Sequence, residues 1–224
     1  MKTKQQLIYS LSLTLLLGLF STVNAQAVRN HVERAQDRNQ ISNDNATIQR
    51  DRAEIQQFRG YRAGLLKAVG NGNAGAARGH HIKLVRAMER EVNQSNAKVS
   101  KSVNELQQSK AEVRSDNREI RRDVSKRKPY RAANDRKERQ DDVRDLADDR
   151  NDLNEVRRRA ARQQEILSVF KGIKFVDNPN VLATIKAKKS LMDEFEQTMV
   201  RDMGENWEEL KEDKRELRED RRQH

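Results

Sequence analysis

One apolar position recurs at every seventh residue between residues 80 and 125, and this repeat restricts the fold more than any other feature of the chain. Its members are Val85, Val92, Val99, Leu106, Val113 and Ile120. An α-helix completes a turn in about 3.6 residues, so a seven-residue interval keeps the six side chains on one stripe, as in coiled coils. A disordered chain rich in both charges would not keep this interval over six repeats. The segment is therefore predicted to be helical.

Three other segments carry stripes of the same kind. Their apolar members are Ile41, Ile48, Ile55, Phe58 and Leu65, then Leu146, Leu153, Ala160 and Leu167, and finally Ile185, Met192, Met199, Met203, Leu210 and Leu217. Charged residues make up 36% of the chain and aromatic residues only 4%, so the apolar seams are narrow. The predicted fold class is all-α: four long antiparallel helices, arranged as two coiled-coil-like hairpins or as one elongated thin bundle.

Helix-breaking residues separate the four segments. Glycines at 70, 72 and 75 follow the first, Pro129 follows the second, and Gly172 with Pro179 follows the third. The predicted domains are a signal peptide over residues 1–25, a first hairpin over 26–128, a break or linker over 129–134, and a second hairpin over 135–224.

A consistent antiparallel register supports this division. The predicted pairs are Leu65 with Ile82, Ile55 with Val92, Ile48 with Val99 and Ile41 with Leu106, then Leu167 with Ile185, Ala160 with Met192, Leu153 with Met199 and Val143 with Leu210. The second and fourth helices also resemble each other in sequence, which predicts an internal duplication. The aromatic residues are spaced as core, namely Phe58, Tyr61, Phe170, Phe175, Phe195 and Trp207. An exposed client-binding tip at Phe170 and Phe175 is the alternative for two of them.

The N-terminus has the three parts of a secretory signal. Lys2 and Lys4 precede an apolar run over residues 7–20, and small or short residues lead up to Ala25. Cleavage is predicted between Ala25 and Gln26, leaving a periplasmic or secreted protein with no integral membrane segment. An uncleaved membrane anchor is the alternative. The chain has no cysteine, which excludes disulfides and a lipid-modified cysteine.

A cationic cluster surrounds the central break. Ten cations accompany four acids between residues 118 and 139: Arg118, Arg121, Arg122, Lys126, Arg127, Lys128, Arg131, Arg136, Lys137 and Arg139. Such a cluster can neutralise the phosphates of lipopolysaccharide or nucleic acid, or bind the acidic face of a partner protein. The alternative is a solvated helix end, where cations also complement the helix dipole.

Nothing in the sequence predicts catalysis or a cofactor. His80 and His81 are the only metal-ligand candidates, and adjacent helix residues point about 100° apart, which disfavours joint chelation. A thin helical seam also lacks the enclosed pocket that catalysis needs. The predicted function is non-enzymatic: a structural or protein-interaction role in the bacterial envelope, in a chaperone-like manner, with a protein partner or a second copy of the chain. Polyanion binding through residues 118–139 is the alternative, and a periplasmic metal sensor is a third.

Overall fold

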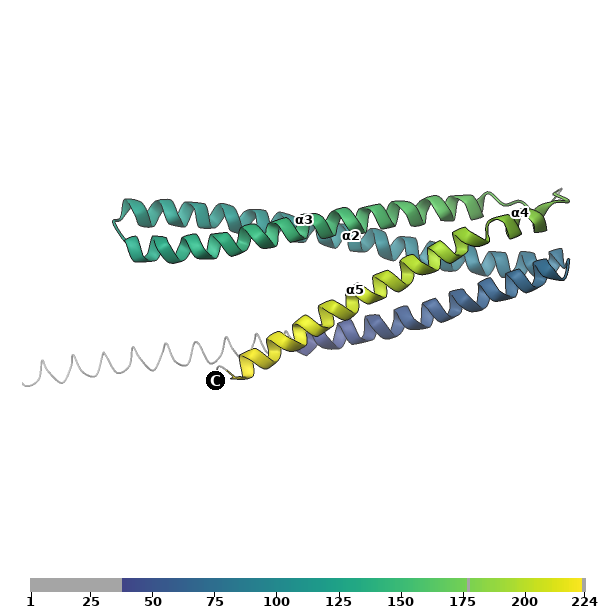
Figure 1. Cartoon of the computed structure of the whole chain (residues 1–224), viewed down its shortest axis with the longest axis horizontal. Helices are drawn as coiled ribbons and strands as arrows, with labels where there is room; N and C mark the ends of the chain where they lie inside the picture. Colours follow the sequence, from purple (N-terminus) through teal and green to yellow (C-terminus); the bar gives the residue numbers. More distant parts are fainter. Residues whose placement is uncertain (1–37, 177, 223–224) are drawn as a thin grey trace, which may run out of the picture. The chain divides into compact units, whose positions relative to one another are not determined.

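The computed structural model describes residues 38–176 and 178–222, and in this part every regular element is an α-helix (Figure 1). Residues 38–70 are helical, followed by α2 (Ala74–Ser125), α3 (Pro129–Lys171), α4 (Val181–Ala187) and α5 (Lys189–Arg222). The all-α prediction is confirmed. None of the described helices is long and apolar enough to cross a membrane.

The chain divides into two compact units. One unit combines residues 1–53 with residues 201–224, of which 38–53 and 201–222 are described. Within it the helix over residues 38–53 lies against α5, because Asn206 Nδ2 donates a 2.8 Å hydrogen bond to Asp51 Oδ2. Ile48 and Leu210 are buried there. The predicted pairs Ile48–Val99 and Ile41–Leu106 each combine residues of different units, and they stay predictions.

Residues 54–200 form the second unit, in which α2 and α3 pack side by side. Ser95 Oγ of α2 donates a 2.6 Å hydrogen bond to Gln163 Oε1 of α3. Nearer the turn that joins these helices, the Ser109 hydroxyl donates to the Asp149 carboxylate. The predicted hairpins do not pair these two helices, so this packing is a finding of the structure.

The helix over residues 38–70 is called here the first helix, and its residues 54–70 belong to the same unit. There the first helix contacts both α2 and α5. Arg90 Nη2 donates to Gln57 Oε1 at 3.3 Å, close to the buried residues Ile55 and Val92 that the sequence pairs. On α5, Phe195 stacks on Phe58 with ring centroids 5.5 Å apart.

A bidentate ion pair links α3 to α5. Arg162 Nε and Nη2 donate to the two Glu194 oxygens at 2.6 and 2.7 Å. This pairing raises the pKa of the Arg162 guanidinium and lowers the pKa of the Glu194 carboxyl. In this unit the first helix contacts α2, α2 contacts α3, α3 contacts α5, and α5 contacts the first helix. The four segments therefore surround a common interior.

The buried face of α2 differs from the predicted stripe. Ile82, predicted to pair with Leu65, is 42% exposed, whereas Leu84 and Met88 are fully buried. The reason is geometric: α2 packs against both the first helix and α3, so its buried face turns toward both neighbours. Trp207, predicted as core, is likewise 41% exposed.

The helix breaks also shift slightly from their predicted positions. The turn between α2 and α3 is confined to residues 126–128, and Pro129 is the first residue of α3. Residues 129–134 are therefore helical, not a linker. Proline fits there because the first-turn N–H groups of a helix have no partner within the helix.

Candidate functional site

The end of the unit at which α2 turns into α3 gathers the cationic cluster, and residues 118–139 are named here the cationic tip. Three backbone hydrogen bonds close the turn. Lys126 N donates to Arg122 O at 3.0 Å, Arg127 N to Val124 O at 3.1 Å, and Lys128 N to Asp123 O at 2.9 Å. This pattern is a Schellman motif, in which one residue takes a left-handed backbone conformation. That residue is Arg127, with φ of 52°.

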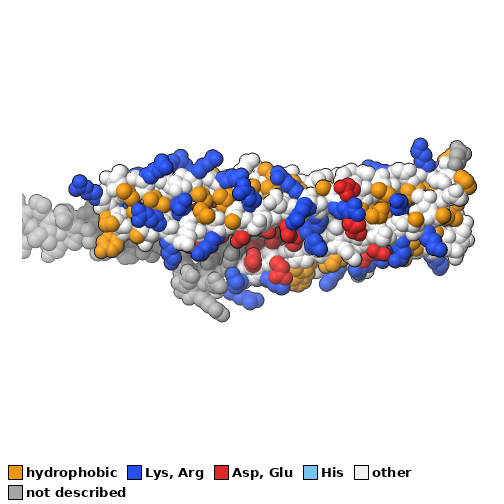
Figure 2. All heavy atoms as spheres, turned by 45° about the horizontal axis from the view of Figure 1, so that its top comes forward, with side chains coloured by type: hydrophobic (Ala, Val, Ile, Leu, Met, Phe, Trp, Pro, Cys, Tyr) orange, Lys and Arg blue, Asp and Glu red, His pale blue; other side chains and the backbone are white. Residues whose placement is uncertain are grey.

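All ten predicted cations lie in the cationic tip. Nine are exposed and Arg139 is half-buried. They come from the end of one helix, the turn and the start of the next, so the hairpin concentrates residues that the sequence spreads over 22 positions. On the face drawn in Figure 2, Lys and Arg side chains with apolar side chains between them cover this end of α2 and α3.

Acidic residues neutralise only part of this charge. The tip holds four acids, Glu119, Asp123, Asp135 and Glu138, which leaves a net charge of ten minus four, or +6. One ion pair joins Arg122 Nη2 to Glu119 Oε1 at 3.3 Å, on exposed side chains. Exposed pairs of this kind stabilise little and exchange readily with other anions. The tip therefore presents positive charge to solvent.

Two apolar side chains at the tip were not singled out as functional by the sequence. Tyr130 is 88% exposed and Val124 is 53% exposed. Tyr130 is the second residue of α3, and Val124 is the last residue but one of α2. Only Ala132 of this region is buried, because the two helices have little apolar surface to share near the turn.

Behind the tip, two carboxyl groups meet across the α2–α3 interface. A hydrogen bond with Asp116 raises the pKa of the Asp142 carboxyl, with smaller contributions from burial and from the Asp116 and Asp141 charges. Two neighbouring carboxylates repel when both are ionised, so protonation of Asp142 is favoured.

At the opposite end of this unit, His81 of α2 is buried against the end of α3. Its Nε2–H donates a 3.0 Å hydrogen bond to the Phe170 carbonyl, and its ring lies 5.1 Å from the Phe175 ring. Burial lowers the pKa of the His81 imidazole, and the hydrogen bond to Phe170 offsets part of this effect.

The structure does not bring the two histidines together as a metal site. His80 lies over Gly64 of the first helix, where any Cβ would overlap its imidazole ring. His81 instead faces the aromatic side chains of the α3 end. No group of three or more metal-binding side chains occurs among residues 38–176 and 178–222.

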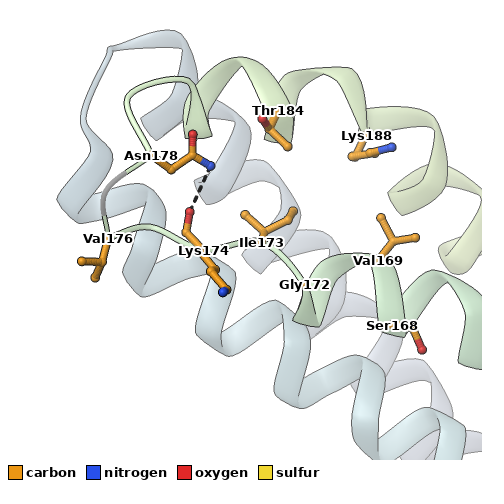
Figure 3. A pocket seen from close by; sticks show the side chains of 9 residues that line it. All are labelled: Ser168, Val169, Gly172, Ile173, Lys174, Val176, Asn178, Thr184 and Lys188. Carbon is orange, nitrogen blue, oxygen red and sulfur yellow. Dashed lines mark hydrogen bonds between the residues drawn. The ribbon is translucent and has the colours of Figure 1, made fainter.

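Phe170 and Phe175 do not form an exposed client-binding tip. Phe170 is fully buried, and Phe175 is half-buried against His81. Beside them, an open pocket of about 650 Å³ lies between the end of α3 and α4 (Figure 3). Val169, Ile173 and Val176 supply its apolar lining, and its polar lining includes Lys174 and Lys188.

A polar layer is buried midway along the same unit. Gln163 Nε2 donates to Thr198 Oγ1 at 3.0 Å and to Glu91 Oε1 at 3.5 Å, while its Oε1 accepts from Ser95. Arg159, one turn earlier on α3, is also buried. The sequence did not predict this layer, because a polar residue on a seam normally marks a weak position. The layer links three helices and fixes their alignment.

The predicted signal peptide and its cleavage site at Ala25 and Gln26 lie outside the described residues. Comparison of the chain with protein-family models, with curated proteins and with solved structures found no match.

Proposed function

We propose that the chain is a non-enzymatic binding protein of the bacterial envelope and that it binds polyanions through the cationic tip. The observation that carries this proposal is the gathering of ten cations against four acids at one helical turn, with nine of the cations exposed. The two helices already hold these cations close together, so contact with phosphates orders no further backbone and releases the counterions of the polyanion.

The backbone of the turn adds support. Arg127 occupies a left-handed position at which glycine is the favoured residue. An arginine there costs folding free energy and places a cation at the apex. A solvated helix end with no binding role has no need of such a residue.

The test compares two variants with the same change in net charge. In the first, Arg121, Arg122, Lys126, Arg127 and Lys128 are replaced by Gln. In the matched control, five exposed cations outside the tip are replaced by Gln: Lys83, Arg86, Arg150, Arg157 and Arg158. Gln is a fair helix former, so circular dichroism should show both variants folded.

Binding to duplex DNA and to lipopolysaccharide is then measured over a range of salt concentrations. We expect the tip variant to lose binding, and the salt dependence to fall by about 0.9 in log–log slope for each phosphate contact removed from DNA. The control should retain the slope of the parent. Equal losses in the two variants would mean that total charge matters and the tip does not. Absence of binding by the parent at low salt would reject the proposal.

A protein-interaction role, in a chaperone-like manner, is the second candidate. The pocket between α3 and α4 favours it, because Val169 and Val176 offer exposed apolar surface to an unfolded segment or to a second copy of the chain. Val169→Ser with Val176→Ser should then weaken the suppression of client aggregation at any salt concentration. Undiminished suppression would reject this candidate.

The proposed compartment rests on residues 1–25. Lys2, Lys4, the apolar run and Ala25 match a cleavable signal, so the mature chain should begin at Gln26 with a net charge of +9, since the signal carries two lysines and no acid. Intact-mass measurement of the exported protein tests this. A chain that retains Met1 in a membrane fraction would instead favour an anchor.

We also propose that the long antiparallel helices, with their thin apolar seams, arose by duplication of one hairpin, with residues 26–128 and residues 135–224 as the two copies. The sequence likeness between residues 82–113 and residues 185–217 supports the duplication. An oligomer would cover further apolar surface on such thin seams, and light scattering measures its size.

A further inference from the structure

The cationic tip carries exposed apolar side chains at its apex, where a purely electrostatic site needs none. Tyr130 and Val124 flank the turn that holds Lys126, Arg127 and Lys128. Tyrosine is enriched where a membrane meets water, because its ring contacts acyl chains while its hydroxyl stays hydrated. Lysine and arginine suit the same layer, since their stems are apolar and their charged ends reach phosphate groups.

The cations of the tip point in several directions. Successive helix residues differ by about 100°, so Arg131, Arg136 and Lys137 lie on three different sides of α3. A rigid duplex would meet only one of these sides. A layer of lipid headgroups surrounds a protruding hairpin and can place a phosphate on each side. The geometry therefore favours a lipid surface over a nucleic acid.

We propose that the cationic tip docks on a membrane surface rich in anionic phospholipid, with Tyr130 and Val124 entering the headgroup layer and the surrounding cations binding lipid phosphates. This inference rests on the proposed polyanion binding and names its ligand. The described helices contain no segment able to span a bilayer, and the apex offers only two large apolar side chains. Docking is therefore confined to the interface and is reversible.

The experiment uses the full chain and two kinds of vesicle, one of phosphatidylcholine alone and one containing phosphatidylglycerol as well. Co-sedimentation should occur with the second kind and not with the first. The double variant Tyr130→Ser with Val124→Ser should bind the anionic vesicles at least about tenfold more weakly, while its binding to heparin is unchanged. Val143→Ser is the matched control, since Val143 is an exposed apolar residue of α3 away from the apex.

A spectroscopic variant reports on depth. Trp207 is the only tryptophan of the chain, so Tyr130→Trp combined with Trp207→Phe places the single tryptophan at the apex, where its emission can be excited selectively. Its emission should shift to the blue on anionic vesicles and stay unchanged with heparin.

Each outcome decides between the two levels of the proposal. DNA or heparin binding without vesicle binding would overturn the membrane inference and leave polyanion binding standing. Vesicle binding with no loss in the serine variant and no spectral shift would likewise overturn it, because the apex would then stay outside the headgroup layer. A parent chain that binds neither DNA, nor heparin, nor anionic vesicles would reject both polyanion binding and membrane docking.

Discussion

Gly72 and Arg127 occupy the same position in two turns of the same construction. Each follows a long helix and has a positive φ, 69° at Gly72 and 52° at Arg127. Each turn is closed by the same three backbone hydrogen bonds, which at the first turn run from residues 71, 72 and 73 to Lys67, Val69 and Ala68. Only glycine adopts this conformation without strain, so the first turn shows which residue the second would carry for stability alone.

Arg127→Gly should therefore raise the free energy of unfolding by about 0.5–1 kcal/mol, because relief of left-handed strain exceeds the entropic cost of a new glycine. Polyanion binding should weaken, since one apical cation is lost. Denaturant unfolding and salt-dependent binding measure the two effects. The control is Arg121→Gly, inside α2, which should instead lower stability by about 1 kcal/mol. A destabilised Arg127→Gly variant would contradict this reading of the turn.

Phe195→Ala should lower the free energy of unfolding by about 3–5 kcal/mol, because Phe195 is fully buried and stacks on Phe58. Thermal unfolding followed by circular dichroism measures the loss. Trp207→Ala serves as the comparison, since the larger but 41% exposed Trp207 side chain should cost less than about 1 kcal/mol. Similar losses in the two variants would argue against the packing of the first helix on α5.

Gln163→Leu should cost about 1–3 kcal/mol, since it removes the hydrogen-bond partner of Ser95 and Thr198 within the interior. Adding Ser95→Ala to this variant should cost less than the two single losses combined, because the hydroxyl that lost its partner is then gone as well. The exposed Gln164→Leu is a control for the change of residue type and should stay within about 0.5 kcal/mol. Strict additivity of the Gln163 and Ser95 changes would mean that the two side chains do not interact.

Acid should weaken the end of the unit that contains His81. Burial holds the pKa of His81 below its ordinary value of 6.5, so the unfolded chain binds the proton more tightly than the folded one. The stabilisation that neutral His81 contributes to the folded state is complete above pH 6.5, and it is lost as the pH falls through the pKa of His81 in the folded chain. His81→Gln keeps an N–H donor for the Phe170 carbonyl and does not titrate. The free energy of unfolding of the His81→Gln variant should therefore depend less on pH below 6.5 than that of the parent. The same pH dependence in both proteins would show that His81 does not cause the loss of stability in acid.

At the Asp116–Asp142 carboxyl pair behind the tip, stability should depend on pH in the opposite sense. The Asp116 hydrogen bond raises the pKa of Asp142 above the ordinary 3.8, so its stabilising contribution is present in acid and is lost as the pH rises through the folded pKa. Asp142→Asn should stabilise the hairpin at neutral pH and make no comparable difference below pH 3.8. Urea unfolding at several pH values tests this, because urea is uncharged and leaves the carboxylate repulsion unscreened. A variant less stable than the parent at neutral pH would show that the two carboxyl groups do not repel.

Helix content follows directly from the order of residues in this chain. The seven-residue repeat from Val85 to Ile120 requires a helix whatever its partners are, because only helical geometry places those positions on one side. The turn after Gly70 and the break before Pro129 follow from local backbone preferences, which also act without tertiary contacts. The exposure of the tip cations also follows from the sequence alone, because a narrow apolar seam has no room for ten charged side chains.

Partner choice depended on the tertiary structure. Each of these charged helices has one narrow apolar stripe, and sliding one helix along another by a turn still brings apolar residues together. The apolar pattern alone therefore does not select the packing of α2 on α3. That packing turns Ile82 outward and buries Gln163, whose amide is stable in the interior because Ser95, Thr198 and Glu91 supply hydrogen-bond partners. It also draws the cations of two helices to one end. The positive φ of Arg127 is decided there too, because the three hydrogen bonds that close the turn impose it on whichever residue stands at that position.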